Sequence, residues 1–407
     1  MSEWKKVKLG DYCLKIGSGS TPKGGSTVYV ESGTSFIRSQ NVYNLSFDYN
    51  GLTHITEEAA NKLKGVTVFD EDILLNITGD SVARTCIVPN DVLPARVNQH
   101  VAIVRVDRKK MNGRFLNYYL ASPRMQSFML SLAVGKGASR NAMTKQMIEN
   151  FEVPCPPLDT QQQIATILSR YDSLIENYQK QIKLLEESAQ HLYKEWFVDL
   201  RFPGYENVQI VDGVPEGWEK KKIFELGKVV TGKTPSTANK ANYGGDIPFI
   251  TIPDMHSGIY PTCSQTLSKQ GAESQLGKYI PENSLMVSCI GTAGLVCISE
   301  TLCQTNQQIN SLVMENGLNL YYMYFTFLSL KEHLNNIGSN GATMTNVNKS
   351  KFENIEVVVP IDSLLDSFNI IANNTFVKIK NLSLQIRHLI EARGRLLPKL
   401  MSGEIEV

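Results

Sequence analysis

The sequence lacks the features of a membrane protein and of a metal site. Its 407 residues contain no apolar run of about 18 residues, and the most apolar stretch, residues 318–330, is interrupted by Asn319. The polar, basic segment after Met1 is not that of a signal peptide. The seven cysteines include no CxxC pair and the six histidines are scattered, so the usual zinc spacings are excluded. These absences predict a cytoplasmic protein with free thiols, no membrane partner and no metal.

The sequence also has no large excess of charge of either sign. Its 41 Lys and Arg residues balance 40 Asp and Glu residues, which excludes both an acidic disordered scaffold and a histone-like binder. Residues 1–155 hold 19 basic and 14 acidic side chains, whereas residues 201–360 hold 12 and 14. A DNA-binding protein with this balance is expected to share its contacts to phosphates with another subunit.

The clearest positive feature is an internal repeat. Residues 137–153 match residues 341–357 at an offset of 204, with Lys145 over Lys349. Shorter matches continue upstream at a changing offset: residues 98–100 with 306–308, residues 36–37 with 249–250, residues 21–22 with 234–235, and Trp4 with Trp218. The chain therefore consists of two copies of one unit that differ in loop lengths.

Each copy is expected to hold a strand-rich globule followed by one long helix, which gives an α+β fold with pseudo-two-fold internal symmetry. Short apolar runs bounded by Gly, Asn, Asp and Pro indicate strands, and helices are expected near residues 115–132 and 320–334. The predicted domains are a first globule (1–155), a first long helix (156–200), a linker (201–216), a second globule (217–360), and a second long helix with a tail (361–407).

The long helices carry an apolar seam. Its positions alternate in steps of four and three, which is typical of a coiled coil, and adding 204 carries the seam into the second copy, where Thr375 and Arg393 are its polar members. A helix of about 40 residues spans roughly 60 Å, so the two helices most simply bury their seams on each other as an antiparallel spacer. The residues expected to form this pair are Tyr171, Ile175, Tyr178, Ile182, Leu185, Leu192, Trp196, Ile379, Leu382, Ile386, Leu389, Leu396 and Leu400.

One motif suggests nucleotide chemistry. Residues 227–234 fit the pattern G-x-x-x-x-G-K-[ST] of a phosphate loop, in which Lys233 and Thr234 would hold phosphate and magnesium. That loop requires a helix directly after it, but Pro235 and a polar run without apolar periodicity follow. The equivalent residues 17–22 of the first copy lack the lysine. The match is therefore expected to be accidental.

No catalytic constellation occurs in both copies. Amino-group methyl transfer would require an Asn/Asp-Pro-Pro-aromatic segment, and the one Pro-Pro pair, Pro156-Pro157, instead precedes the long helix. No nuclease-type carboxylate cluster with lysine is convincing. We therefore expect no catalytic residue in this chain.

Polar loops do recur in both copies. Asn and Gln can pair bidentately with adenine and Arg with guanine, although such side chains also cap turns. Residues identical in both copies, such as Asn98 and Asn306, suit a structural role, whereas differing ones, such as Arg38 against Thr251, suit base recognition. The candidate DNA-binding residues are Arg38, Ser39, Gln40, Asn41, Arg84, Gln99, His100, Lys136, Ser139, Arg140, Lys233, Thr251, Thr292, Gln307, Gln308, Thr343, Thr345 and Asn346.

Taken together, the chain resembles the specificity subunit of a Type I restriction-modification system. The resemblance covers nearly the whole chain, through residues 4–11 and 217–223 at the starts of the globules, residues 36–42 and 72–75 within the first globule, residues 156–165 at the first helix entry, and residues 396–405 at the end. The second helix entry, residues 361–366, lacks the Gln run of the first.

This resemblance implies a protein without its own active site that reads a bipartite double-stranded DNA target, with one half-site for each target recognition domain. It implies partnership with two adenine-methylating subunits and up to two ATP-dependent restriction subunits. S-adenosylmethionine, ATP and Mg²⁺ would then belong to those partners. Two alternatives remain: a phosphate-loop nucleotide hydrolase, which an ATP-binding assay would reveal, and a coiled-coil scaffold without DNA contact, which sequence-dependent DNA retention would exclude.

Overall fold

The computed structural model describes residues 4–134, 141–211, 213–314, 320–339 and 345–407. The chain divides into two compact units: unit 1 comprises Met1–Asn177 and Ile386–Val407, and unit 2 comprises Tyr178–Gln385. Each unit thus holds one globule together with part of each long helix. The division cuts across the predicted helix segments because the apolar helix faces join the cores of the globules.

Unit 1 is built on a four-stranded antiparallel sheet with the order β10-β9-β12-β2. Successive residues of β9 enter different apolar clusters, so both faces of this sheet are covered. The strands are β2 (Cys13–Ser18), β9 (Ile73–Asn76), β10 (Thr85–Ile87) and β12 (Val101–Val106). A second sheet has the order β3-β7-β4-β11-β8, and its strands are β3 (Tyr29–Val30), β4 (Thr34–Ile37), β7 (Thr53–Ile55), β8 (Thr67–Val68) and β11 (Ala95–Val97).

Shorter elements complete unit 1. Two strand pairs are β1 (Lys6–Lys8) with β13 (Glu152–Pro154), and β5 (Val42–Tyr43) with β6 (Ser46–Phe47). The helices are α1 (Glu57–Lys62), α2 (Gly113–Ala121), α3 (Pro123–Ala133) and α4 (Lys145–Glu149).

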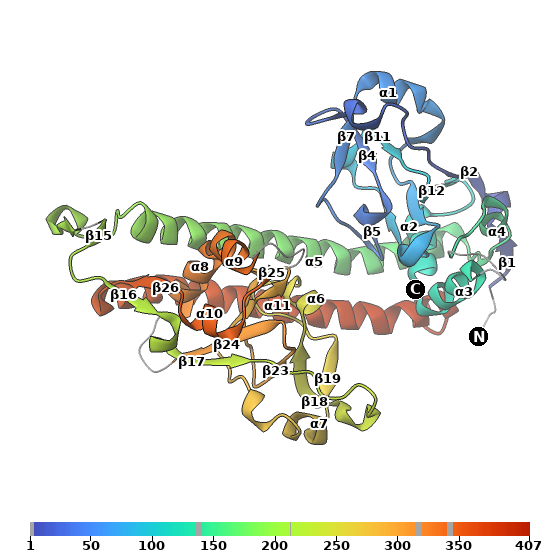
Figure 1. Ribbon diagram of the computed structural model, residues 1–407. Coiled ribbons are helices and arrows are strands. Elements are labelled where there is room, and N and C mark those ends of the chain that lie inside the picture. The colour runs from blue at the N-terminus through green and yellow to red at the C-terminus, as the bar shows by residue number, and fades with distance from the viewer. Residues whose placement is uncertain (1–3, 135–140, 212, 315–319, 340–344) are drawn as a thin grey trace. The chain divides into compact units, whose positions relative to one another are not determined.

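Unit 2 repeats this plan. Its central sheet has the equivalent order β22-β20-β24-β17. The parallel pair β18–β23 corresponds to the parallel pair β4–β11 of unit 1, and these four strands are labelled in Figure 1. The strands are β16 (Glu219–Lys222), β17 (Gly227–Thr231), β18 (Tyr243–Ile250), β19 (Gln265–Leu267), β20 (Leu285–Ser288), β21 (Ile290–Gly291), β22 (Val296–Ile298), β23 (Gln304–Thr305), β24 (Ile309–Met314), β25 (Thr345–Asn346) and β26 (Glu356–Val359). The helices are α6 (Ile252–Met255), α7 (Lys269–Glu273), α8 (Leu320–Ser329), α9 (Lys331–Gly338) and α10 (Lys349–Glu353).

Three details differ from the sequence-based expectations. The helix expected near residues 115–132 is split into α2 and α3, because Ser122 precedes Pro123, is extended and caps α3. The helix expected near residues 320–334 is likewise split, into α8 and α9. The expected linker contains a small hairpin, β14 (Ile210–Val211) with β15 (Val214–Pro215).

The two long helices are α5 (Leu158–Tyr193) and α11 (Asp362–Ser402). Within unit 1, Arg393 of α11 forms a half-buried ion pair with Asp172 of α5, which also accepts a hydrogen bond from the Tyr118 hydroxyl. Within unit 2, the ring centroid of Trp196, just beyond α5, lies 6.0 Å from that of Phe368. Later positions of α5 thus meet earlier positions of α11, which confirms the predicted antiparallel coiled coil.

The structure places all the seam residues of both helices at buried or half-buried positions. The polar member Arg393 is accommodated by its ion pair with Asp172. The first turns of α11 bury further residues that the seam did not include, namely Phe368, Ala372 and Phe376, each at most 1% exposed. These residues join the globule core of unit 2, so α11 is a core helix of that unit as well as a member of the helix pair.

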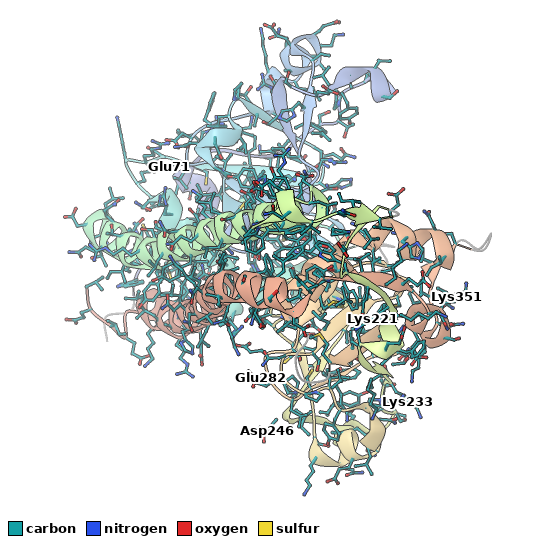
Figure 2. All side chains as sticks on the ribbon, turned by 90° about the vertical axis from the view of Figure 1, so that its left-hand side faces the viewer. Glu71, Lys221, Lys233, Asp246, Glu282 and Lys351 are labelled. Carbon is teal, nitrogen blue, oxygen red and sulfur yellow. The ribbon has the colours of Figure 1, made fainter. Side chains whose placement is uncertain are left out.

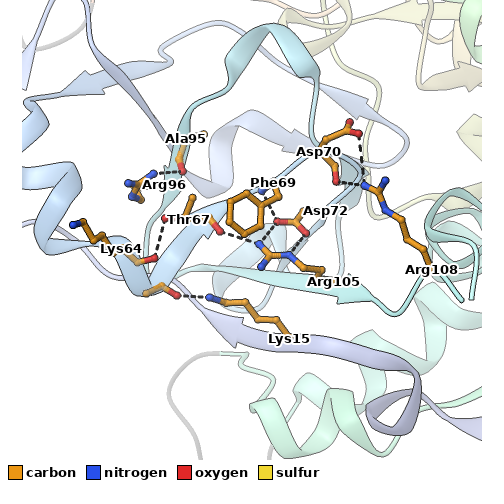
Figure 3. Close-up of polar contacts among 11 residues, drawn as sticks. Lys15, Lys64, Thr67, Phe69, Asp70, Asp72, Ala95, Arg96, Arg105 and Arg108 are labelled. Carbon is orange, nitrogen blue, oxygen red and sulfur yellow. Dashed lines mark hydrogen bonds and ion pairs between the residues drawn. The ribbon is translucent and has the colours of Figure 1, made fainter. Parts of the chain in front are cut away.

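A buried ion pair holds the end of the unit 1 sheet at which β9 begins and β12 ends (Figure 3). The Arg105 guanidinium donates to both carboxylate oxygens of Asp72 at 2.7 Å, and the Asp72 side chain is 1% exposed. The Arg105 guanidinium carbon also lies 4.1 Å from the centroid of the Phe69 ring. Nearby, Arg108 pairs with Asp70 at 3.6 Å, but both side chains are more than half exposed.

We expect Asp72→Ala to destabilise the protein by about 2–4 kcal/mol, because it leaves the half-buried Arg105 charge without its partner. The matched change Asp70→Ala should cost no more than about 1 kcal/mol, because its ion pair is exposed to solvent. Urea unfolding of the two variants tests this difference. Equal losses of stability would show that the buried pair has no special role.

Burial raises the pKa of Glu186 on α5 to about 7, with a smaller contribution from neighbouring Glu187. A folded-state pKa above the ordinary value of 4.5 means that the stability linked to this proton is fully present below pH 4.5. It is lost as the pH rises through about 7, where the buried carboxyl ionises.

Glu186→Gln should therefore raise the melting temperature at pH 8 and leave it nearly unchanged at pH 4.5, because glutamine stays neutral throughout. Glu187→Gln is the control, since the Glu187 side chain is 51% exposed and its carboxylate lies 3.9 Å from the Lys183 ammonium group. Calorimetry at both pH values measures the effect. A gain of the same size at both pH values would contradict the account.

Candidate nucleic-acid interface

Four loop segments of unit 1 meet where β9 ends and β12 begins. The Ile77 N–H donates to the His100 carbonyl at 2.9 Å, and the Met143 N–H donates to the Ile77 carbonyl at 2.8 Å. The Asn76 side-chain amide donates to the Ser39 carbonyl at 2.8 Å. We call residues 38–44, 76–84, 98–100 and 141–143 the unit 1 loop cluster.

Unit 2 builds the same junction at the equivalent end of its sheet. The Cys289 N–H donates to the Gln308 carbonyl at 2.8 Å, and the Val347 N–H donates to the Cys289 carbonyl at 2.9 Å. The adjoining strands β21 and β25 pair at Ile290 and Asn346. We call residues 250–254, 288–295, 306–308 and 345–347 the unit 2 loop cluster.

A threonine–glutamine bond closes each cluster. The Thr234 hydroxyl donates to the Gln307 side-chain oxygen at 2.7 Å, and the Thr21 hydroxyl donates to that of Gln99. The candidates Gln99 and Gln307 thus each accept the same kind of loop-closing hydrogen bond, one in each unit. This agrees with the expectation that residues identical in both copies have a structural role.

The residues that fit the phosphate-loop pattern have another geometry. Residues 227–231 are strand β17, and residues 232–237, all of which are described, form no helix. The Lys233 N–H donates to the Thr305 carbonyl at 2.9 Å and so is not available to cradle phosphate. A β-carbon on Gly232 would lie 2.2 Å from the Asn306 carbonyl oxygen, so this glycine permits close backbone packing. Nothing in this geometry supports the nucleotide-hydrolase alternative.

Several asparagine side chains of the two clusters hold loop backbone, and one of them, Asn41, is a candidate. The Asn98 side-chain oxygen accepts the His100 N–H at 3.1 Å, and Asn306 accepts the Gln308 N–H at the same distance. Asn41 is fully buried and donates to loop carbonyls. In these three residues the side chain shapes a turn and leaves little for a ligand.

The other candidates in the unit 1 loop cluster differ in how many of their donors are engaged. The Arg38 guanidinium donates one bond, to the Gly51 carbonyl at 2.7 Å, and its buried Nε has no hydrogen-bond partner among the described residues. His100 is half-buried, and both of its ring nitrogens have partners: Nδ1 lies 2.6 Å from the Thr78 hydroxyl oxygen, and Nε2 lies 3.2 Å from the Gln99 side-chain nitrogen. Ser39 is half-buried, and Gln40 is exposed.

Most of the candidate DNA-binding residues of unit 2 have uncharged side chains. Thr251 donates to the Asp254 carboxylate at 2.7 Å and caps α6, so it serves the local turn. Lys233 is exposed at the surface of unit 2 (Figure 2). The other candidates of unit 2 differ in exposure: Thr292, Gln307 and Asn346 are also exposed, and Gln308 and Thr345 are half-buried.

Four further candidates, three of the first copy and one of the second, lie outside the described residues: Lys136, Ser139, Arg140 and Thr343.

Sequence reasoning missed two buried asparagines that hold the clusters together. Asn76 ties β9 to the segment at Ser39, and Asn310 accepts the Thr231 hydroxyl at 2.6 Å and donates to the Val347 carbonyl. Both are at most 2% exposed. An amide within an otherwise apolar strand was the available signal, because a buried polar group requires a partner.

The described residues offer little chemistry for bond making. Among them, no group of three or more His, Cys, Asp and Glu side chains could hold a metal ion. Burial raises the pKa of the thiols of Cys86, Cys289, Cys297 and Cys303 to about 12 in each case, so they stay protonated at neutral pH. The two clusters therefore offer hydrogen-bond donors and acceptors suited to binding.

Comparisons with known proteins agree with this arrangement. Residues 1–187 and 215–363 match the family model of the Type I restriction modification DNA specificity domain. The chain is 28% identical, over its full length and that of the relative, to the Type I restriction enzyme HindI specificity subunit of Haemophilus influenzae. It is 25% identical to the Type I restriction enzyme MjaIX specificity subunit of Methanocaldococcus jannaschii, over 100% of this chain and 94% of that one.

A solved structure shares the fold. The S subunit of a Type I restriction-modification system from M. genitalium aligns with a TM-score of 0.58 at 14% identity, over 98% of this chain and 96% of that one. Within the described residues, no helix is long and apolar enough to cross a membrane. Because the family model matches both repeats, the chain belongs to the family of Type I restriction-modification DNA specificity subunits, which recognise DNA and are not the catalytic subunits.

Proposed function

We propose that each loop cluster reads one half of a bipartite double-stranded DNA target. The single observation that carries this proposal is the duplicated backbone junction at residues 77, 100 and 143 and again at residues 289, 308 and 347. The same frame presents different side chains in the two units, so the two half-sites are expected to differ in sequence.

The charges of the clusters support different modes of reading. The unit 1 loop cluster carries Arg38 and Arg84, whose guanidinium groups suit guanine, whereas the unit 2 loop cluster presents amides and hydroxyls such as those of Asn346 and Thr292. Because the whole chain has a net charge of only +1, much of the contact to phosphates falls to partner subunits.

In this proposal the chain works in a cytoplasmic complex with two adenine-methylating subunits and up to two ATP-dependent restriction subunits. The names of the full-length relatives, specificity subunits of Type I restriction enzymes, support a multi-subunit setting. S-adenosylmethionine, ATP and Mg²⁺ would be bound by those partners. This chain would supply recognition, and its helix pair would set the unread gap between the half-sites.

We expect Arg38→Ala and Asn346→Ala to relax different half-sites when the chain is co-expressed with its methylating partner. Each variant should lose about 1–3 kcal/mol of discrimination at one base pair, because one pair of hydrogen bonds to a base edge is removed. Single-molecule methylome sequencing of the host reads both half-sites at once. Relaxation of the same half-site by both variants, or an unbroken target without a gap, would contradict the proposal.

A further inference from the structure

A β-bulge directs one arginine of the unit 1 loop cluster. Ala83 and Arg84 both face Asn76: the Ala83 N–H donates to the Asn76 carbonyl at 2.9 Å, and the Asn76 N–H donates to the Arg84 carbonyl at 2.8 Å. Ala83 is fully buried and has a φ of 73°, in the left-handed region that a residue with a β-carbon rarely occupies. The fold therefore holds a strained residue directly before Arg84.

Unit 2 contains the same bulge without the strain. The Gly294 N–H donates to the Ser288 carbonyl at 3.0 Å, and the Ser288 N–H donates to the Leu295 carbonyl at 2.9 Å. Here the left-handed position, with a φ of 89°, belongs to glycine. The second residue of the bulge, after the left-handed position, is leucine in unit 2 and arginine in unit 1, so the common backbone presents an apolar side chain in one copy and a cation in the other.

The ring of Tyr43 fixes the direction of the Arg84 side chain. The Arg84 guanidinium carbon lies 4.5 Å from the centroid of this ring, and Tyr43 is 40% exposed. Tyr43 belongs to the β5–β6 hairpin, which is joined to the bulge by the Leu45 N–H donating to the Thr85 carbonyl at 2.9 Å. The ring and the guanidinium are thus held on connected segments.

A glutamine of α3 is hydrogen-bonded to both the bulge and the β5–β6 hairpin. The Gln126 side-chain amide donates to the Ala83 carbonyl at 2.8 Å, and its oxygen accepts from the Asn44 side chain at 3.1 Å. The Asn44 side-chain oxygen in turn accepts the Thr85 N–H at 3.1 Å. The bulge and the hairpin are therefore both fixed to one helix.

The guanidinium itself is left with unused donors. Within the described residues, Arg84 makes no side-chain hydrogen bond and no ion pair, and its one assigned contact is the Tyr43 ring. A planar cation held against a ring keeps its edge free, and that edge can donate two parallel hydrogen bonds. The Asn76 side chain connects the bulge to Ser39, so this edge adjoins the rest of the unit 1 loop cluster.

We propose that the Ala83–Arg84 bulge and the Tyr43 ring position Arg84 to donate two hydrogen bonds to O6 and N7 of a guanine in one half-site. The inference rests on the proposed function and adds a specificity-determining residue and its base. Guanine is favoured over a phosphate because the side chain has a fixed orientation, which base reading needs and which a phosphate contact does not. Unit 2, with Leu295 at this position, has no equivalent contact.

The test uses the full chain assembled with its methylating partner, and target DNAs in which each base pair is replaced in turn. Arg84→Ala should reduce discrimination about 10- to 100-fold at one G·C pair of a single half-site. Arg84→Lys should lose the same discrimination although it keeps the charge. Tyr43→Ala should weaken discrimination at that same pair, and Tyr43→Phe, which retains an aromatic ring, should restore it.

Arg108→Ala is the matched control, because it removes an exposed unit 1 arginine that is paired with Asp70 and Glu71. It should leave the recognised sequence unchanged, and circular dichroism of each assembled variant checks folding. A uniform loss of affinity that Arg84→Lys repairs would overturn the inference in favour of a phosphate contact. Unchanged discrimination at every pair in Arg84→Ala, with a bipartite target in the parent, would overturn this inference alone. A parent without a bipartite target would overturn the proposed function as well.

Discussion

The structure depends on a small set of main-chain hydrogen bonds at one end of each central sheet. The bonds at Ile77 and Cys289 join three segments that are distant in sequence, and they use only backbone groups. Because backbone groups make the frame, the side chains on it can change without loss of the junction. His100 in unit 1 and Gln308 in unit 2 occupy equivalent places with different chemistry. In the proposed function, one fold thus supplies two reading surfaces of different specificity.

The long helices are stabilised by the globule cores as well as by their contact with each other. Within unit 2, residues of α5 and α11 share one apolar cluster with the central sheet, and within unit 1 the first turns of α5 and the end of α11 join the globule core. Burial of large side chains such as Phe368 and Phe376 gives the helices a fixed position within each core. In the proposed role as a spacer, a helix attached in this way holds its angle to its own globule better than one joined by a flexible linker.

The sequence predicted the repeat, the two long helices and their antiparallel pairing, because each leaves a periodic trace over many residues. It predicted the helices of the globules less well. The break between α2 and α3 depends on the single dipeptide Ser122–Pro123, which interrupts an otherwise helical pattern. The match at residues 227–234 was expected to be accidental because Pro235 and a polar run follow it, and the contacts of Gly232 add that this glycine permits close backbone packing. The contribution of Ala83 arises from long-range backbone geometry, which local patterns do not record.

In the proposed function the same frame is used twice, once for each half of the DNA target. The most direct measurement replaces residues 217–360 with a second copy of residues 4–155, leaves both long helices in place, and determines the methylated sequence in a host that carries the methylating partner. Two identical globules on an antiparallel helix pair should recognise an inverted repeat of the first half-site, with a gap close to that of the parent. Methylation that stayed at the parental asymmetric sequence, by a chimera that folds and assembles, would contradict the account.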